Sequence, residues 1–93
     1  MSRISDLIAR KGAEDPALAQ AFAQEREGLE VAVALAKLRE DMGLTQRALA
    51  ERSGRPQSTI ARIENGSMNA SVALLGEIAS SVGKRVELRF VDA

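Results

Sequence analysis

A long amphipathic segment occupies the first half of the chain and predicts one extended helix. The pair Asp15-Pro16 is a strong helix start, because aspartate caps free backbone N–H groups and proline suits the first helical position. From there the helical spacing of apolar residues continues to about Asp41. We expect both of its apolar stripes to lie in the core. The stripes are Leu18, Phe22, Leu29, Val33 and Ala36, and Val31, Leu35, Leu38 and Met42.

Two glycines mark expected breaks in the N-terminal part of the chain. A first short helix is expected to end at Gly12. Gly28 lies inside the long helical pattern, where glycine costs about 1 kcal/mol relative to alanine. We therefore expect a bend near Gly28 that separates a helical arm, residues 1–28, from the domain proper, residues 29–83.

Three shorter helices follow the long one. Each begins after a capping residue or a proline, and each is closed by a glycine, which adopts a left-handed turn conformation at little cost. The first of these helices lies between Thr45 and Gly54, the second between Pro56 and Gly66, and the third between Ser71 and Gly83.

The tail, residues 84–93, has a different period. Apolar and charged residues alternate strictly there, which is typical of a half-buried β-strand. The alternating residues are Val86, Leu88 and Phe90 on one face and Arg85, Glu87 and Arg89 on the other. A single strand cannot satisfy its own backbone groups, and the sequence supplies no second good strand. Either another copy or another protein pairs with it, or the tail packs as an extended segment on the helices.

The composition is that of one small folded domain. The 93 residues are 45% hydrophobic and 28% charged, with a net charge of zero. The absence of Cys and His excludes the usual zinc sites and removes the commonest general base. We expect no metal, no cofactor and no enzymatic activity. The N-terminus does not resemble a signal peptide and no apolar run could span a bilayer, so we expect a cytoplasmic protein with no membrane contact.

The segment LTQRALAERSGRPQSTIARIENG, residues 44–66, is the most informative part of the chain. Two short helical patterns flank a turn glycine, which is the arrangement of a helix-turn-helix. Ile60 and Ile63 fall on one side of the second helix and leave a polar side opposite. The segment holds four arginines against two glutamates, a modest local excess that suits specific DNA binding better than sequence-blind binding.

The polar side of that second helix suits direct readout of DNA bases. Gln can pair with adenine and Arg with guanine through two hydrogen bonds each, and a small residue such as Ala61 permits close approach. Gln46 and the loop residues are placed to contact phosphates. The predicted DNA-contacting residues are Gln46, Arg55, Gln57, Ser58, Thr59, Ala61, Arg62, Asn65, Ser67 and Asn69. The alternative is an ordinary solvated helix face.

Glu64 faces away from this polar side and back toward the long helix. Arg39, near the end of that helix, can reach it. We expect Arg39 and Glu64 to form a structural ion pair that ties the two helices together, rather than a catalytic group.

These residues closely resemble the Cro/C1-type (XRE-like) helix-turn-helix family of prokaryotic and phage regulators. The resemblance covers residues 35–83 and rests on Leu44, Gln46, Leu49, Ala50, Gly54, Ile60, Ile63, Glu64, Gly66, Leu75, Ile78 and Ala79. It implies a mainly α-helical, lambda-repressor-like bundle that binds a pseudo-palindromic operator in double-stranded DNA as a homodimer. The sequence departs from the family at Arg55, Ala61 and Ala70, where an apolar residue, Ser and Pro are usual, so it implies no operator sequence.

The flanks are similar to one branch of that family, the HigA-type antitoxins. The similarity rests on the short first helix, the segment GAEDPALAQAFAQE and the strand-like RVELRFV. It implies a protein that neutralises a small RelE-like ribonuclease toxin and represses its own operon, with the arm and the C-terminal strand facing the toxin. The acidic bias of residues 14–30 would favour a basic partner, although a solvated helix face has the same composition.

Three alternatives remain beside a repressor that is also an antitoxin. A stand-alone regulator would lack the toxin. A protein-interaction module would have lost DNA binding, which the presence of Gln46, Gln57 and Arg62 disfavours. An enzyme is disfavoured because cyanase, which has a similar helical domain, carries its catalytic residues in a further domain that 93 residues cannot contain.

Overall fold

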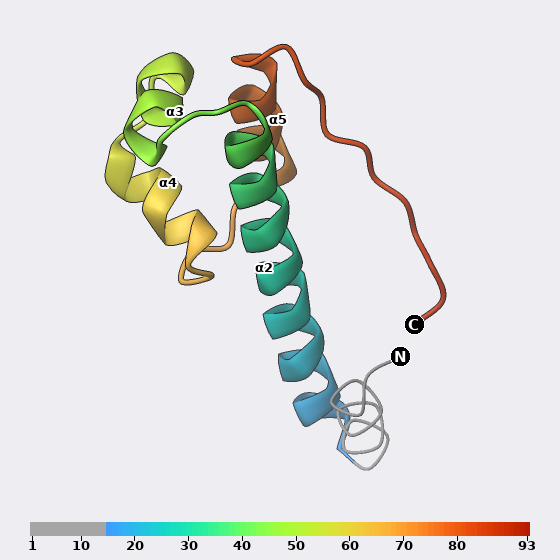
Figure 1. Ribbon diagram of the computed structural model, residues 1–93. Helices are drawn as coiled ribbons and strands as arrows, with labels where there is room; N and C mark the ends of the chain where they lie inside the picture. The colour runs from blue at the N-terminus through green and yellow to red at the C-terminus, as the bar shows by residue number, and fades with distance from the viewer. Residues whose placement is uncertain (1–14) are drawn as a thin grey trace.

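The computed structural model describes residues 15–93, which form a helical bundle followed by an extended tail (Figure 1). The helices are α2 (Pro16–Asp41), α3 (Gln46–Ser53), α4 (Gln57–Glu64) and α5 (Val72–Ser80). The shorter helices pack around the C-terminal half of α2, and the N-terminal half of α2 projects beyond them (Figure 1). This confirms the predicted mainly α-helical class. The helix expected before Gly12 lies outside the described residues.

Helix α2 begins where the sequence predicts. The Asp15 carboxylate accepts hydrogen bonds from the backbone N–H groups of Ala17, at 3.0 Å, and Leu18, at 3.3 Å, and Pro16 fills the first helical position. Gly43 follows the end of the helix with a φ of 69°, a left-handed conformation that favours glycine. Neither α2 nor any other described helix has the length and apolarity needed to cross a membrane.

Gly28 does not interrupt α2, which is one continuous helix through the position where a bend was expected. The residue instead faces the loop that follows α4. A Cβ atom added to Gly28 would lie 3.9 Å from the Asn69 side-chain oxygen, an ordinary van der Waals distance. A methyl group therefore fits between α2 and the loop, and the backbone needs no glycine conformation there.

Replacing Gly28 by alanine is expected to raise the free energy of unfolding by about 0.5–1 kcal/mol, because alanine has the better helix propensity and fits the available space. Urea unfolding followed by circular dichroism, at one fixed protein concentration, measures the change. Gly43→Ala is the matched control and should destabilise the protein, because its φ of 69° strains any residue with a Cβ. A destabilised Gly28→Ala protein would mean that the loop requires the glycine.

The hydrophobic core lies where the four helices meet. Leu49, Ile60, Ile63 and Ile78 are completely buried, and Leu35, Ala50 and Val82 complete the cluster. The path between α3 and α4 is the predicted one. Thr45 caps α3 through its hydroxyl oxygen, which accepts a hydrogen bond from the Ala48 N–H at 3.0 Å, and Gly54 turns the chain with a φ of 67°. The core therefore fixes α4 against the bundle along one side.

Only one of the two predicted apolar stripes of α2 reaches this core. Leu35 is buried, but Leu29 is 62% exposed and Val33 is 66% exposed. Met42 is also exposed. The prediction that both stripes are core is wrong for the described chain, because the shorter helices cover only one side of α2 and leave Leu29 and Val33 of the other stripe facing solvent.

The tail forms no strand in the described structure. Gly83, with a φ of 74°, turns the chain after α5, and residues 84–93 then run clear of the helices (Figure 1). Leu88 and Phe90 are exposed. The predicted strand is absent from the single chain because residues 15–93 offer it no strand with which to pair, and the alternative of a tail packed on the helices is not seen either.

Candidate nucleic-acid interface

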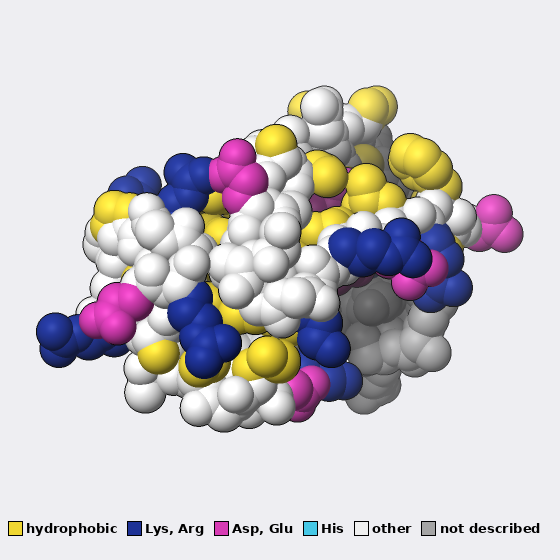
Figure 2. All heavy atoms as spheres, turned by 90° about the horizontal axis from the view of Figure 1, so that it is seen from above, with side chains coloured by type: hydrophobic (Ala, Val, Ile, Leu, Met, Phe, Trp, Pro, Cys, Tyr) yellow, Lys and Arg dark blue, Asp and Glu magenta, His cyan; other side chains and the backbone are white. Residues whose placement is uncertain are grey.

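Charged side chains of both signs are distributed over the end of the molecule that carries the short helices. Figure 2 shows basic and acidic groups interspersed on that face, without one large basic patch. A surface of this kind attracts phosphates only weakly as a whole. Binding to DNA would therefore depend on particular side chains and on how the fold orients them.

Helix α4 turns a polar side to solvent because two isoleucines hold its other side in the core. Ile60 and Ile63 have no exposed surface. At 100° per residue, Ser58, Ala61 and Arg62 lie on the side opposite the isoleucines. The predicted DNA contacts on α4 differ in exposure: Gln57, Ser58 and Arg62 are exposed, and Thr59 and Ala61 are half-buried. Asn65, which caps the C-terminus of α4, is also exposed.

Arg62 is the side chain on α4 that is best suited to reach a base. It is exposed, and none of the ion pairs within the described part of the chain includes it. Glu64, which lies on the same helix, is engaged by another arginine. The Arg62 guanidinium therefore keeps a planar set of donors that matches the two acceptors of guanine in the major groove.

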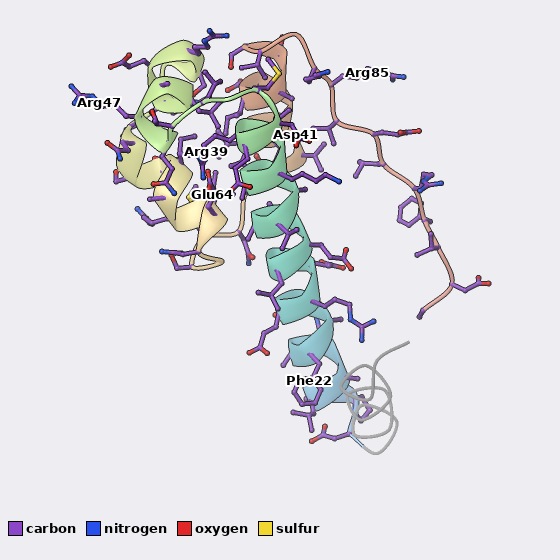
Figure 3. The ribbon with its side chains drawn as sticks, in the orientation of Figure 1. Phe22, Arg39, Asp41, Arg47, Glu64 and Arg85 are labelled. Atoms are coloured by element: carbon purple, nitrogen blue, oxygen red, sulfur yellow. The ribbon has the colours of Figure 1, made fainter. Side chains whose placement is uncertain are left out.

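An ion pair fixes the C-terminal end of α4 against α2 (Figure 3). The Arg39 Nε atom donates to Glu64 Oε2 at 2.9 Å, and Nη2 donates to Oε1 at 3.0 Å. Arg39 Nη1 donates to the Leu44 carbonyl oxygen at 2.9 Å. This is the pair expected from the sequence. The hydrogen bonds to Glu64 raise the pKa of Arg39 against the opposing effect of burial, so the guanidinium stays charged.

Gln46 leans toward this ion pair. Its Nε2 atom donates to Glu64 Oε1 at 3.4 Å, a long hydrogen bond, and the side chain is half-buried. The sequence predicts a phosphate contact for this residue. The structure places the amide between the start of α3 and Glu64, so that Gln46 also helps to position α4.

Arg55 is engaged by a residue that the sequence did not indicate. Its guanidinium forms an ion pair with Glu77 of α5. The turn between α3 and α4 is thereby joined to α5, and the predicted phosphate contact of Arg55 would compete with this ion pair. Both side chains are partly exposed, and ion pairs in such positions contribute little to stability.

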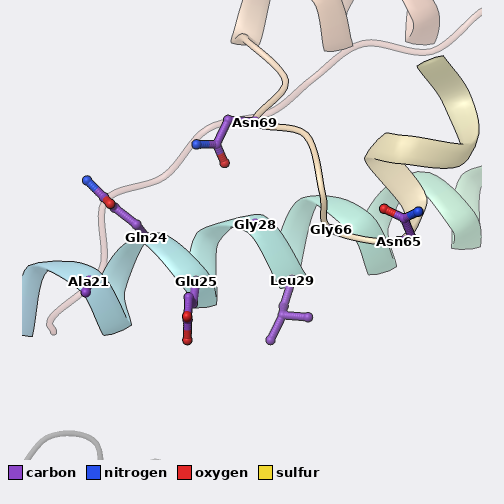
Figure 4. A pocket seen from close by; sticks show the side chains of 8 residues that line it. All are labelled: Ala21, Gln24, Glu25, Gly28, Leu29, Asn65, Gly66 and Asn69. Atoms are coloured by element: carbon purple, nitrogen blue, oxygen red, sulfur yellow. The ribbon is translucent and has the colours of Figure 1, made fainter. Parts of the chain in front are cut away.

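The loop after α4 is shaped by its own polar groups. The Asn65 side-chain oxygen accepts a hydrogen bond from the Ser67 N–H at 2.9 Å, and Gly66 has a φ of 79°. Figure 4 shows Asn65 and Asn69 at a cleft of about 500 Å³ between this loop and α2. Asn65 therefore uses its carbonyl oxygen inside the loop, while Ser67 and Asn69 are exposed near the end of α4.

A family model described as helix-turn-helix matches residues 35–88, more than half of the chain. The chain belongs to the helix-turn-helix family. The match includes α3, the turn at Gly54, α4 and α5, and it is of the XRE type that the sequence indicates. Nothing among curated proteins or solved structures matches the chain significantly.

Membership of the helix-turn-helix family makes the chain a DNA-binding transcriptional regulator, a class that is not typically enzymatic. In such proteins the helix after the turn enters the major groove. In this helix-turn-helix protein that helix is α4, whose polar side and whose neighbouring loop hold most of the predicted contacts.

Arg47 is a basic residue of the helix-turn-helix that received no predicted contact. Its side chain is 79% exposed and points away from the body of the molecule in Figure 3. It lies 3.6 Å from Glu51, one turn later on the same helix, and both groups are solvated. The signal that could have found it is its place beside Gln46 in the first turn of α3, where backbone N–H groups also face outward.

Proposed function

We propose that this helix-turn-helix protein is a dimeric, sequence-specific repressor, that it autoregulates its operon, and that it is the antitoxin of a RelE-like ribonuclease. The observation that carries the repressor half is the polar side of α4, which Ile60, Ile63 and the Arg39–Glu64 pair hold outward. Two copies would insert α4 into successive major grooves of a pseudo-palindromic operator, roughly 34 Å apart.

The contacts divide between bases and phosphates. Gln57 and Arg62 are assigned to base edges, because their side chains are exposed on α4 and present paired hydrogen-bonding groups. Ser58, Thr59, Ala61 and Asn65 would lie close to the same groove. Gln46, Arg55, Ser67 and Asn69 are assigned to phosphates. Arg55 would leave Glu77 to make its contact, an exchange that a partly exposed ion pair allows.

Replacing Arg62 by alanine is expected to lower the affinity for the operator by about 1–3 kcal/mol and to relax the preference at one base position. Fluorescence anisotropy on the protein's own promoter, with single-base variants of the site, measures both effects. Arg47→Ala is the matched control, since it also removes an exposed arginine. It should weaken binding to all sequences alike and lower the salt dependence. Uniform loss from Arg62→Ala would make Arg62 a phosphate contact.

The side of α2 that the shorter helices leave uncovered supports the antitoxin half of the proposal. Leu29 and Val33 form a shallow apolar surface on α2 that Arg26, Glu30 and Ala34 border. Exposed apolar side chains rimmed by charges are typical of sites that bind other proteins. The exposed carboxylates of Glu25 and Glu27, in the N-terminal half of α2, would suit the basic surface of an RNA-cleaving partner.

The proposed division of labour assigns toxin binding to the arm, which the apolar surface of Leu29 and Val33 adjoins. Residues 1–28 form the arm, residues 29–83 the DNA-binding domain and residues 84–93 the tail. Helix α2 crosses the first of these boundaries without a break, so residues 16–28 are a direct extension of the domain. The runner-up function is a stand-alone regulator, in which the exposed stripe of α2 has no dedicated toxin.

Deleting residues 1–28 is expected to abolish toxin neutralisation and to leave operator binding largely intact. The tagged chain is expressed with its native neighbouring genes, and a small basic protein that stops growth when expressed alone should co-purify in a fixed ratio.

Val33→Glu in the full chain should release that protein, because it places a charge in the apolar stripe. Glu40→Lys, an exposed change farther along α2, is the control and should retain it.

Two outcomes would contradict the antitoxin half. If the chain emerges alone and still shifts its own promoter DNA, it is a stand-alone regulator. If the truncated chain no longer dimerises, the arm is part of the dimer and the proposed division of labour is wrong.

A further inference from the structure

The tail carries a charge pattern that is complementary to a second copy of itself. In an antiparallel pair of strands, residues directly opposite each other share a face. When two copies of the tail are aligned antiparallel about Leu88, every charged pair joins opposite signs. The opposite residues are Lys84 and Asp92, Arg85 and Val91, Val86 and Phe90, and Glu87 and Arg89, each pair occurring twice, with Leu88 opposite Leu88 at the centre.

Neighbouring alignments lose this match. A shift to a centre at Glu87 sets Glu87 opposite itself and Arg85 opposite Arg89, and a centre at Arg89 sets Arg89 opposite itself. Like charges directly opposite destabilise a strand pair. A centre at Val86 keeps an Arg85–Glu87 pair but leaves Phe90 beyond the paired segment. Alignments centred between two residues place apolar side chains opposite charged ones, which breaks the two-faced pattern.

The described helices leave the tail free to form such a pair. Among the described residues, no backbone hydrogen bond involves residues 85–93. Leu88 and Phe90 expose their side chains, and the tail stands clear of the helices (Figure 1). An extended segment with free backbone groups and one apolar face is a template for adding a strand.

We infer that residues 84–92 of two copies pair as an antiparallel ribbon centred on Leu88. The partner of each tail is therefore the tail of a second copy of the chain. This inference rests on the proposed dimer and names the segment that forms its contact. A two-stranded ribbon is only marginally stable by itself, so each cross-strand pair should contribute visibly to the affinity of the dimer.

Single cysteines test the alignment, because the chain has no cysteine of its own. Directly opposite residues have Cα atoms about 4.5–5.5 Å apart, within the usual range of a disulfide. Leu88→Cys should therefore form a disulfide-linked dimer under mild oxidation. Val86→Cys and Phe90→Cys should each cross-link poorly alone and efficiently when the two proteins are mixed, since residue 86 of one copy faces residue 90 of the other.

Charge reversal tests the same alignment without oxidation. Glu87→Arg and Arg89→Glu should each weaken the dimer about tenfold, because each creates two like-charge pairs. Mixing the two variants should restore the dimer, because every reversed residue then meets an opposite charge. Arg85→Glu is the matched control, since Arg85 faces the uncharged Val91, and it should leave the dimer affinity nearly unchanged.

Light scattering of the unmodified chain separates failure of this inference from failure of the dimer. A stable dimer in which the Leu88→Cys variant does not cross-link, or in which the mixed charge variants stay dissociated, overturns the alignment and leaves the dimer standing. A monomeric chain that still requires its tail to bind a co-expressed protein overturns both and assigns the tail to that partner.

Discussion

Replacing Glu64 by alanine is expected to lower the free energy of unfolding by about 2–3 kcal/mol. The Glu64 side chain is 7% exposed and that of Arg39 is 17% exposed, so both charges lie largely out of water. Without the carboxylate, the partners that Arg39 keeps among residues 15–93 are the Leu44 carbonyl and the Glu40 carboxylate, which is 3.9 Å away. Urea unfolding measures the loss, and operator binding should fall as well, because the pair holds the end of α4.

Glu40→Ala is the control for this experiment. Glu40 lies 3.9 Å from the Arg39 guanidinium, but its side chain is 71% exposed, so its removal should change stability by less than about 0.5 kcal/mol. The pH dependence gives a second check. Because the folded state raises the pKa of Arg39, its contribution is complete below the ordinary arginine pKa and is lost only as the pH rises through the higher folded value.

The destabilisation by Glu64→Ala should therefore be the same between about pH 6 and pH 9, well below the arginine range. A Glu64→Ala protein that unfolds with the stability of the Glu40→Ala protein would show that the ion pair is dispensable.

Replacing Ile60 by alanine should have an effect at least as large, with a loss of about 2–5 kcal/mol in the free energy of unfolding. Ile60 is completely buried in the cluster formed with Leu49, Ile63 and Ile78. Truncation removes apolar contacts and leaves a cavity that a small bundle can only partly close. Since domains are typically stable by only about 5–15 kcal/mol, thermal unfolding should begin tens of degrees lower or the protein should fail to fold.

Two further variants make this result interpretable. Ile60→Val should cost only about 0.5–1.5 kcal/mol, because it removes one methyl group from the same site. Val72→Ala truncates an exposed apolar residue of α5 and should cost less than about 0.5 kcal/mol. If Ile60→Ala were no more harmful than Val72→Ala, α4 would not be anchored through this isoleucine.

The sequence predicts those parts of the fold that depend on neighbouring residues. The start of α2 at Asp15, the cap at Thr45, the turn at Gly54 and the cap at Ser71 lie in the structure where the sequence places them. Caps and left-handed glycines act within a few residues of the backbone they satisfy, so the local sequence is sufficient. The buried side of α4 is predictable for the same reason, because two isoleucines three positions apart define it.

The features that the sequence did not predict depend on contacts between distant segments. Arg55 and Glu77 are 22 residues apart, and no local pattern pairs them. Gln46 reaches Glu64, 18 residues away, for the same reason. Arg39 and Glu64 are even farther apart, at 25 residues, but the helix period fixes the direction of Glu64, which makes their pairing predictable.

Apolar stripes show the same limit. The spacing of Leu29 and Val33 identifies them as one face of α2, but it cannot say whether anything covers that face. The tail alternates as a strand does, yet a strand exists only where a second one pairs with it. In both cases the sequence identifies the apolar surface correctly. Which segment or partner covers that surface depends on contacts with residues far away in the sequence or in another chain.

Helix α2 spans two different environments, and this gives a single helix two stabilities. Its 26 residues extend about 39 Å, and only the C-terminal half is locked by buried side chains. The N-terminal half has few buried neighbours among the described residues, and an isolated helix of such length is marginal in water. Amide hydrogens should therefore exchange with solvent much faster before about residue 28 than after it, and the arm can open and close without unfolding the domain to which it is joined.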